Sequence, residues 1–178
     1  DVYITGTIIQ SDGEALELDV EVKDTSGKKW FAKTYKKVVG KLAYDRKEKT
    51  NIGDPFQNVF IQIANDVLTY REKFSDKKAT ELRTISELRF AQLFSPEAFN
   101  EYITPGRNGI LEIQRLPAEN DSLLERVKKI RERDYLYIDT MQDYYDGFSQ
   151  QMHFAYQEFR HSSYDSVVKP RHLTEPVL

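Results

Sequence analysis

The fold is decided by residues 16–35, which read LELDVEVKDTSGKKWFAKTY. Apolar and polar residues alternate from Leu16 to Val22, which is the pattern of a strand with one buried face. A turn follows at Asp24–Gly27, where the glycine accepts a positive φ, and alternation resumes at Trp30. This stretch therefore predicts two antiparallel strands joined by a tight turn.

One further strand is predicted before this hairpin. Val2, Ile4 and Ile8 lie at the two-residue period of a strand, and Ser11–Glu14 contains the Asp-Gly pair typical of a hairpin turn. The three segments together predict an antiparallel meander. Its expected strands are 2–10, 15–23 and 29–36.

The residues after the meander predict a helix that packs across the sheet. Asp54 can cap a helix, and Pro55 suits the first helical position. Apolar residues from Phe56 to Leu68 recur with the period of one helix face. The pattern predicts a helix over about 55–74.

The second half of the chain is predicted to be mostly helical. A capping-box pattern opens at Ser122, and the long helix behind it is expected to bend or break at Gly147. The expected elements are helices at 77–94, at Pro96–Ile103 and from 122 to about 161, with a short strand near 110–116. We therefore predict an α+β fold in two parts, a meander plus helix at 1–74 and a helical region with an extended tail at 75–178.

Composition excludes several kinds of site. The 178 residues are 39% hydrophobic, enough for a core, and 29 acidic against 26 basic residues give a net charge of −3, which disfavours attraction of the whole chain to nucleic acid. The absence of cysteine removes disulfides, thiolate metal sites and cysteine nucleophiles. The sequence has no glycine-rich phosphate loop, serine nucleophile elbow or HExxH pattern. We expect no catalytic residue, cofactor or metal.

About residues 3–70 resemble part of a known bacterial domain. The segments that carry the resemblance are Ile4–Ile8 (ITGTI), the strand ending in Asp-x-x-Gly-Lys at Asp24, the strand opening on Trp30, and the amphipathic helix after it. They resemble half of the αβ domain found in the amino-terminal part of the Tol translocation protein, in the curli secretion lipoprotein and in lipoproteins that activate penicillin-binding proteins.

The resemblance implies an αβ sandwich and a periplasmic or outer-membrane setting. It also implies that the Asp-x-x-Gly-Lys segment is a hairpin turn and carries no catalysis. The strand and helix that precede the meander in that group are absent from the sequence as given. We expect an outer-membrane anchor through a lipidated segment upstream of Asp1.

A basic segment is the first candidate binding surface. Residues 28–50 hold nine basic and two acidic residues, a local charge of +7, with aromatic residues interleaved. Such a segment favours an anionic surface, although lysines on a hairpin edge also serve to discourage edge-to-edge pairing. The candidate residues are Lys28, Lys29, Lys33, Lys36, Lys37 and Lys41.

Carboxylates of the long helix offer an alternative, enzymatic interpretation. Asp134 falls on the apolar stripe between Val127 and Ile138, where a buried carboxylate needs a cationic partner. Expected partners are Arg83, Arg89 or Arg131, and an acid–base pair would use Asp139 or Glu87. We favour a structural ion-pair network.

One pattern in the long helix is shared with metal sites. Glu158 and His161 have the spacing of a di-metal bundle ligand pair. Such a centre needs a second Glu-x-x-His pair, which the sequence lacks. We expect a surface ion pair at this position.

The long helix also carries more aromatic residues than one buried stripe can hide. At about 100° per residue they point in different directions around the helix, so some are expected to meet a partner. The candidate partner-binding residues are Tyr135, Tyr137, Tyr144, Tyr145 and Phe154.

These patterns together favour a non-enzymatic structural or adaptor component of a bacterial envelope assembly. We expect a periplasm-facing outer-membrane lipoprotein that forms homo-oligomers or joins other envelope proteins, with an anionic lipid surface as a further contact. The alternatives are an enzyme acting on an envelope polymer through helix carboxylates and a module that binds polyanions or nucleic acid.

Overall fold

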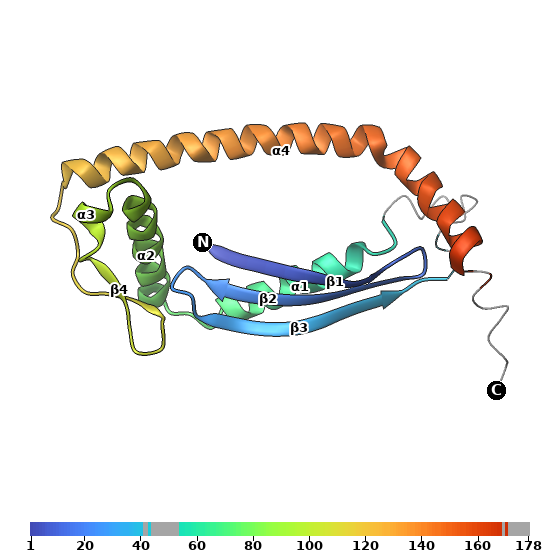
Figure 1. Cartoon of the computed structure of the whole chain (residues 1–178), viewed down its shortest axis with the longest axis horizontal. Coiled ribbons are helices and arrows are strands. Elements are labelled where there is room, and N and C mark those ends of the chain that lie inside the picture. Colours follow the sequence, from blue (N-terminus) through green and yellow to red (C-terminus); the bar gives the residue numbers. More distant parts are fainter. Residues whose placement is uncertain (41–42, 44–53, 169, 171–178) are drawn as a thin grey trace. The chain divides into compact units, whose positions relative to one another are not determined.

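The computed structural model describes residues 1–40, 43, 54–168 and 170 (Figure 1). The predicted α+β class is confirmed: a three-stranded antiparallel sheet of order β1-β2-β3 is followed by helices, the last of them long. The elements are β1 (Val2–Ser11), β2 (Ala15–Asp24), β3 (Lys29–Val38), α1 (Gln57–Arg71), α2 (Asp76–Phe94), α3 (Pro96–Phe99), β4 (Ile103–Pro105), β5 (Leu111–Ile113), α4 (Ser122–Ser163) and a π-helical turn (Tyr164–Val168).

Packing divides the chain into two compact units that interleave along the sequence. The first contains Asp1–Ile4, Glu21–Phe31 and Tyr70–Tyr145. The second contains Thr5–Val20, Ala32–Thr69 and Asp146–Leu178. The sequence predicts a division of the chain at residue 74. The two units do not follow this division, because Asp1–Ile4 and Glu21–Phe31, which contain parts of the sheet, group with α2.

The first unit has its core between α2, α3, the β4–β5 hairpin and the start of α4. Its buried members are Ile85, Leu88, Ala91, Phe99, Ile103 and Val127. The hairpin pairs Ile103 with Ile113 in antiparallel register. Val127 is the buried anchor of α4 in this core.

The third helix is shorter than predicted. It ends at Phe99 and not at Ile103, which is instead the first residue of β4. Pro105 disfavours helical backbone at Thr104, and the buried Ile103 side chain joins the core from an extended strand.

The long helix also differs from the prediction at two positions. Oδ1 of Asp121 accepts hydrogen bonds of 2.9 Å from the backbone N–H groups of Leu123 and Leu124, so the cap is Asp121, one residue before the predicted Ser122. The helix is continuous through Gly147, so a break at this residue is excluded, and a bend there stays a prediction. Its expected end near residue 161 agrees closely with the observed end at Ser163.

In the second unit, α1 packs on β3. The buried Tyr35 donates a hydrogen bond of 2.7 Å from its hydroxyl to Asp66 of the helix. The start of α1 is fixed by Asp54, whose Oδ1 accepts the backbone N–H of Phe56 at 2.9 Å. The guanidinium of Arg160 lies 4.4 Å from the ring centre of the buried Phe56, which ties the end of α4 to this region.

Contacts in the first unit complete the packing of this helix. The indole of Trp30 in β3 stacks on Tyr70 with ring centres 4.9 Å apart and meets Phe74 edge-on at 5.2 Å. Trp30 and Tyr35 therefore both belong to the third strand, as predicted. The helix that was predicted to pack across the sheet contacts this strand through them. The tail beyond Ser166, expected to be extended, lies largely outside the described residues.

Candidate functional site

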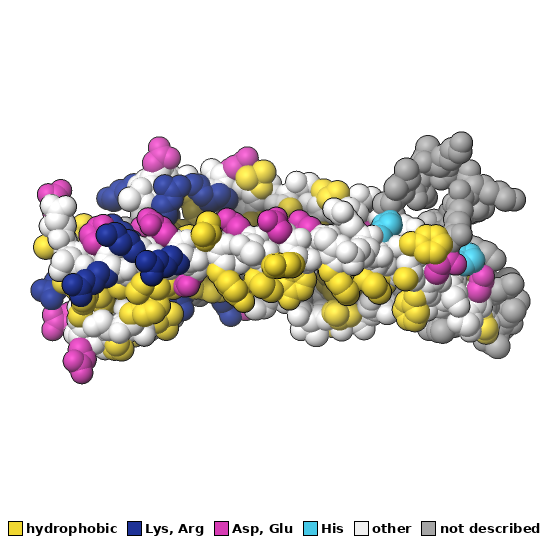
Figure 2. All heavy atoms as spheres, turned by 90° about the horizontal axis from the view of Figure 1, so that it is seen from above, with side chains coloured by type: hydrophobic (Ala, Val, Ile, Leu, Met, Phe, Trp, Pro, Cys, Tyr) yellow, Lys and Arg dark blue, Asp and Glu magenta, His cyan; other side chains and the backbone are white. Residues whose placement is uncertain are grey.

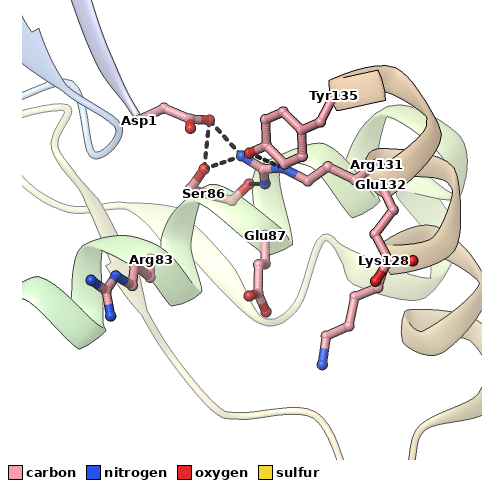
Figure 3. A pocket seen from close by; sticks show the side chains of 8 residues that line it. All are labelled: Asp1, Arg83, Ser86, Glu87, Lys128, Arg131, Glu132 and Tyr135. Carbon is pink, nitrogen blue, oxygen red and sulfur yellow. Dashed lines mark hydrogen bonds and ion pairs between the residues drawn. The ribbon is translucent and has the colours of Figure 1, made fainter. Parts of the chain in front are cut away.

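The first unit holds a polar cluster centred on Arg131 of α4 (Figure 3). Nη2 of Arg131 donates to the carboxylate of Asp1 at 2.6 Å, and Nη1 donates to the backbone carbonyl of Ser86 at 3.0 Å. Nε donates to the hydroxyl of Tyr135 at 2.9 Å, one turn further along α4. The guanidinium also lies 5.2 Å from the ring centre of Phe90. All three guanidinium nitrogens are thus used within the protein.

Ser86 is the second member of this cluster. Its hydroxyl donates to Asp1 at 2.6 Å and accepts from Nη2 of Arg131 at 2.8 Å. A serine nucleophile needs a neighbouring general base to take its proton, and histidine is the usual one. Here the serine hydroxyl is held between a carboxylate and a guanidinium, which suits a clamp between α2 and α4.

A shallow cavity of about 310 Å³ opens beside the cluster. It is lined by Asp1, Arg83, Ser86, Glu87, Lys128, Arg131, Glu132 and Tyr135. Three of these side chains are cationic and three are anionic, so the lining does not favour a ligand of either charge. Figure 3 shows Arg131 pointing toward Asp1 and Ser86, while the side chains of Arg83 and Glu87 lie apart from that cluster.

Asp134 does not form the predicted buried ion pair. Its side chain is exposed, because the helix face around it is not covered within the described chain. Arg131 pairs with Asp1, and Arg89 donates to the backbone carbonyl of Thr25 at 2.6 Å. Of the carboxylates in the predicted acid–base pair, Glu87 lines the cavity, whereas Asp134 and Asp139 are exposed on α4 and are not among its lining residues.

The most extensive feature is an apolar stripe on α4. At about 100° per residue, its members fall within roughly 120° of the helix circumference. We call the following residues the α4 stripe: Tyr137, Ile138, Met141, Tyr144, Tyr145, Phe148, Met152, Tyr156 and Phe159. All are exposed except Met141, which is half-buried; Tyr144 is 70% exposed and Phe148 is 61% exposed. Figure 2 shows hydrophobic side chains in a row along this helix.

The predicted partner-binding residues divide between this stripe and other directions. Tyr137, Tyr144 and Tyr145 belong to the stripe. Tyr135 points elsewhere and is held by Arg131. Phe154 is as exposed as Tyr145, at 65%, but lies roughly 180° from Tyr145 around the helix.

The predicted basic surface is partly neutralised by its own acidic neighbours. Lys33 pairs with Asp66 at 2.6 Å, Lys36 pairs with Glu17 at 2.5 Å, and Lys29 pairs with Glu21. The ion pairs formed by Lys23 and Lys29 hold the pKa of Glu21 below its usual value. Exposed side chains at this edge also include Lys28 and Lys37, and Lys41 lies outside the described residues. Anionic-surface binding stays a prediction.

Sequence reasoning missed the structural role of Asp24. Its Oδ1 accepts hydrogen bonds from the backbone and hydroxyl of Ser26, at 2.9 and 2.5 Å, and its Oδ2 accepts the Trp30 indole N–H at 3.0 Å. The Asp-x-x-Gly pattern signals the turn. The contact to Trp30 has no local sequence signal.

Comparisons with models of protein families, with curated proteins and with solved structures found no match to this chain. In the part of the chain that the structure describes, no group of histidine, aspartate or glutamate side chains could hold a metal ion. Within the same residues, no helix combines the length and apolar character needed to span a membrane.

Proposed function

We propose that this protein is a non-enzymatic structural or adaptor component that binds a helix of another protein through the α4 stripe. The observation that carries the proposal is the exposure of this stripe over more than twenty consecutive residues of one helix, from Tyr137 to Phe159. Single exposed apolar residues are common on protein surfaces, but a contiguous apolar patch of this extent usually marks an interaction site.

The area of the stripe is suited to a stable interface. An aromatic side chain presents roughly 200 Å², of which about two-thirds is exposed here, so the six aromatic residues of the stripe offer roughly 800 Å². A standard protein–protein interface buries about 800 Å² on each partner. Tyrosine and phenylalanine are also the side chains that interface centres favour.

The pattern within the stripe favours a helical partner. Val127, Asp134, Met141 and Phe148 recur every seven residues, and Ile138, Tyr145, Met152 and Phe159 form a second seven-residue series. Two such series produce the seam along which helices pack side by side. Val127, at the beginning of this seam, is buried in the core of the first unit. The α4 stripe, which continues the seam along the helix, is exposed.

A bacterial envelope setting belongs to the same proposal. Its support is the resemblance of residues 3–70 to the αβ domain of envelope lipoproteins. The non-enzymatic role is supported by the Arg131 cluster, where Ser86 is hydrogen-bonded to Asp1 and Arg131 in a clamp.

The proposal is tested by site-specific photo-cross-linking in cells that produce the full-length protein. A photoreactive phenylalanine analogue replaces Tyr145 in one variant and Phe154 in the other, two positions of equal exposure on opposite sides of α4. We expect an adduct from position 145 that maps to an apolar helix of another protein, with little adduct from position 154. Cell fractionation should place the adduct in the envelope.

The second part of the cross-linking test introduces a charge into the α4 stripe. Tyr144→Asp should reduce the adduct formed from position 145 at least tenfold, whereas Gln150→Asp, on the side of α4 opposite the α4 stripe, should leave it unchanged. Both variants should keep the thermal midpoint of the parent. Equal adducts from positions 145 and 154, or none from either, would overturn the proposal.

A further inference from the structure

Strand β1 is an apolar strand at the edge of the sheet. Among the strands of the described residues, the order β1-β2-β3 pairs it with β2 only (Figure 1). Residues 2–10 read VYITGTIIQ and contain no charged side chain. Ile4 is 54% exposed and Ile8 is 67% exposed. An uncharged apolar edge strand of this length is a template for pairing with another strand.

The opposite edge of the same sheet is built differently. β3 carries Lys29, Lys33, Lys36 and Lys37 within ten residues. Lysines on an edge strand discourage pairing with further strands, because their charge would have to be desolvated or brought close to other charges. Since β3 has this protection and β1 has none, β1 is the edge at which the sheet can be extended.

The sequence of β1 indicates what extends it. The strand is nearly symmetric about Gly6: Ile4 and Ile8 lie two residues on either side, and Tyr3 and Ile9 lie three residues on either side. Two copies paired antiparallel with Gly6 opposite Gly6 would place each Ile4 opposite Ile8 and each Tyr3 opposite Ile9. Aromatic and β-branched residues are the favourable cross-strand partners in antiparallel sheets.

The pleat of the sheet supports this register. Residues opposite each other in an antiparallel pair point to the same face, so a two-fold pair can match only positions whose numbers are both even or both odd. Pairing centred on Thr5 would set Ile4 against Gly6, and pairing centred on Thr7 would set Gly6 against Ile8. Of these three registers, only the one centred on Gly6 pairs Ile4 with Ile8.

We propose that two copies of this chain associate through β1, antiparallel and centred on Gly6, so that their two sheets become one sheet of six strands. The contact is isologous, since each copy supplies the same surface. This proposal uses a different surface from the α4 stripe and does not depend on the function proposed for it.

Cysteine cross-linking tests the register directly, because the chain has no cysteine of its own. Ile4→Cys and Ile8→Cys are prepared separately as the full chain, then oxidised alone and after mixing. In the proposed pair, position 4 of one copy lies about 5 Å from position 8 of the other, whereas two copies of position 4 are separated by roughly 14 Å. We expect a disulfide-linked dimer from the mixture and little from either variant alone.

The matched control uses the two edges of the sheet. Ile4 in β1 and Val38 in β3 are both 54% exposed, so lysine at either position makes a similar change at opposite edges. Ile4→Lys should raise the dimer dissociation constant at least tenfold in sedimentation experiments, and Val38→Lys should leave it unchanged. Circular dichroism should show both variants folded. A monomer at all concentrations, or cross-linking no stronger in the mixture than in each variant alone, would overturn the proposal.

Discussion

The indole N–H of Trp30 donates a hydrogen bond of 3.0 Å to Oδ2 of Asp24, and both side chains are buried. The other oxygen of Asp24 accepts the backbone N–H groups of Ser26 and, at 3.2 Å, Lys28. One carboxylate therefore fixes the turn between β2 and β3 and positions the aromatic residue that packs on Tyr70. The turn and the packing of the helix are coupled through a single side chain.

The first prediction concerns Trp30 itself. Trp30→Ala removes the ring that stacks on Tyr70, and it should lower the free energy of unfolding by about 3 kcal/mol or more. Trp30→Phe keeps most of the packing and loses the indole donor, so its cost should be smaller. Denaturant unfolding measures both. A midpoint for Trp30→Ala equal to that of the parent would contradict the placement of the indole.

The second prediction concerns Tyr35 at alkaline pH. Burial, together with its hydrogen bond to Asp66, raises the pKa of the Tyr35 hydroxyl above its usual value. The unfolded chain therefore loses this proton at lower pH than the folded chain, and stability should fall as the pH rises above about 10. Tyr35→Phe should make this alkaline loss shallower. The measurement is the urea midpoint between pH 8 and 11, with the exposed Tyr144→Phe as the control. An alkaline loss equally steep in Tyr35→Phe and in the control would contradict this prediction.

The third prediction concerns Arg131. Arg131→Ala leaves Asp1 and Ser86 without their shared cationic donor and should lower the free energy of unfolding by about 1–3 kcal/mol. Arg133, two residues further along α4, is exposed, and Arg133→Ala should change stability by less than about 0.5 kcal/mol. Chemical denaturation measures both variants. Equal values for them would show that the cluster is not a clamp.

The sequence alone was sufficient where structure depends on neighbours in the chain. The alternation around Val22, the turn at Gly27 and the helix start after Asp54 are local patterns, and each is found in the structure. Ile103 departs from the helix prediction because its role is set by pairing with Ile113 and by the buried core it joins.

The Arg131 cluster could not be predicted in the same way. Asp1 and Ser86 are separated from Arg131 by 130 and 45 positions in the sequence, and no local pattern links them. Asp134 was expected to be buried because periodicity identifies a face of a helix but not what covers it. The exposure of aromatic residues on α4 could be anticipated, because their number exceeds what one buried stripe can hold; that they bind a partner stays a prediction.

The contrast between the two edges of the sheet limits how many chains can associate through it. In an isologous pair, each β1 occupies the other, so the pairing edge of both copies is used at once. The edges that remain are the two β3 strands with their lysines. In the proposed pair, the described part of this sheet then offers further copies no apolar edge, so association through it would stop at two chains and make a closed dimer, not an open-ended fibre.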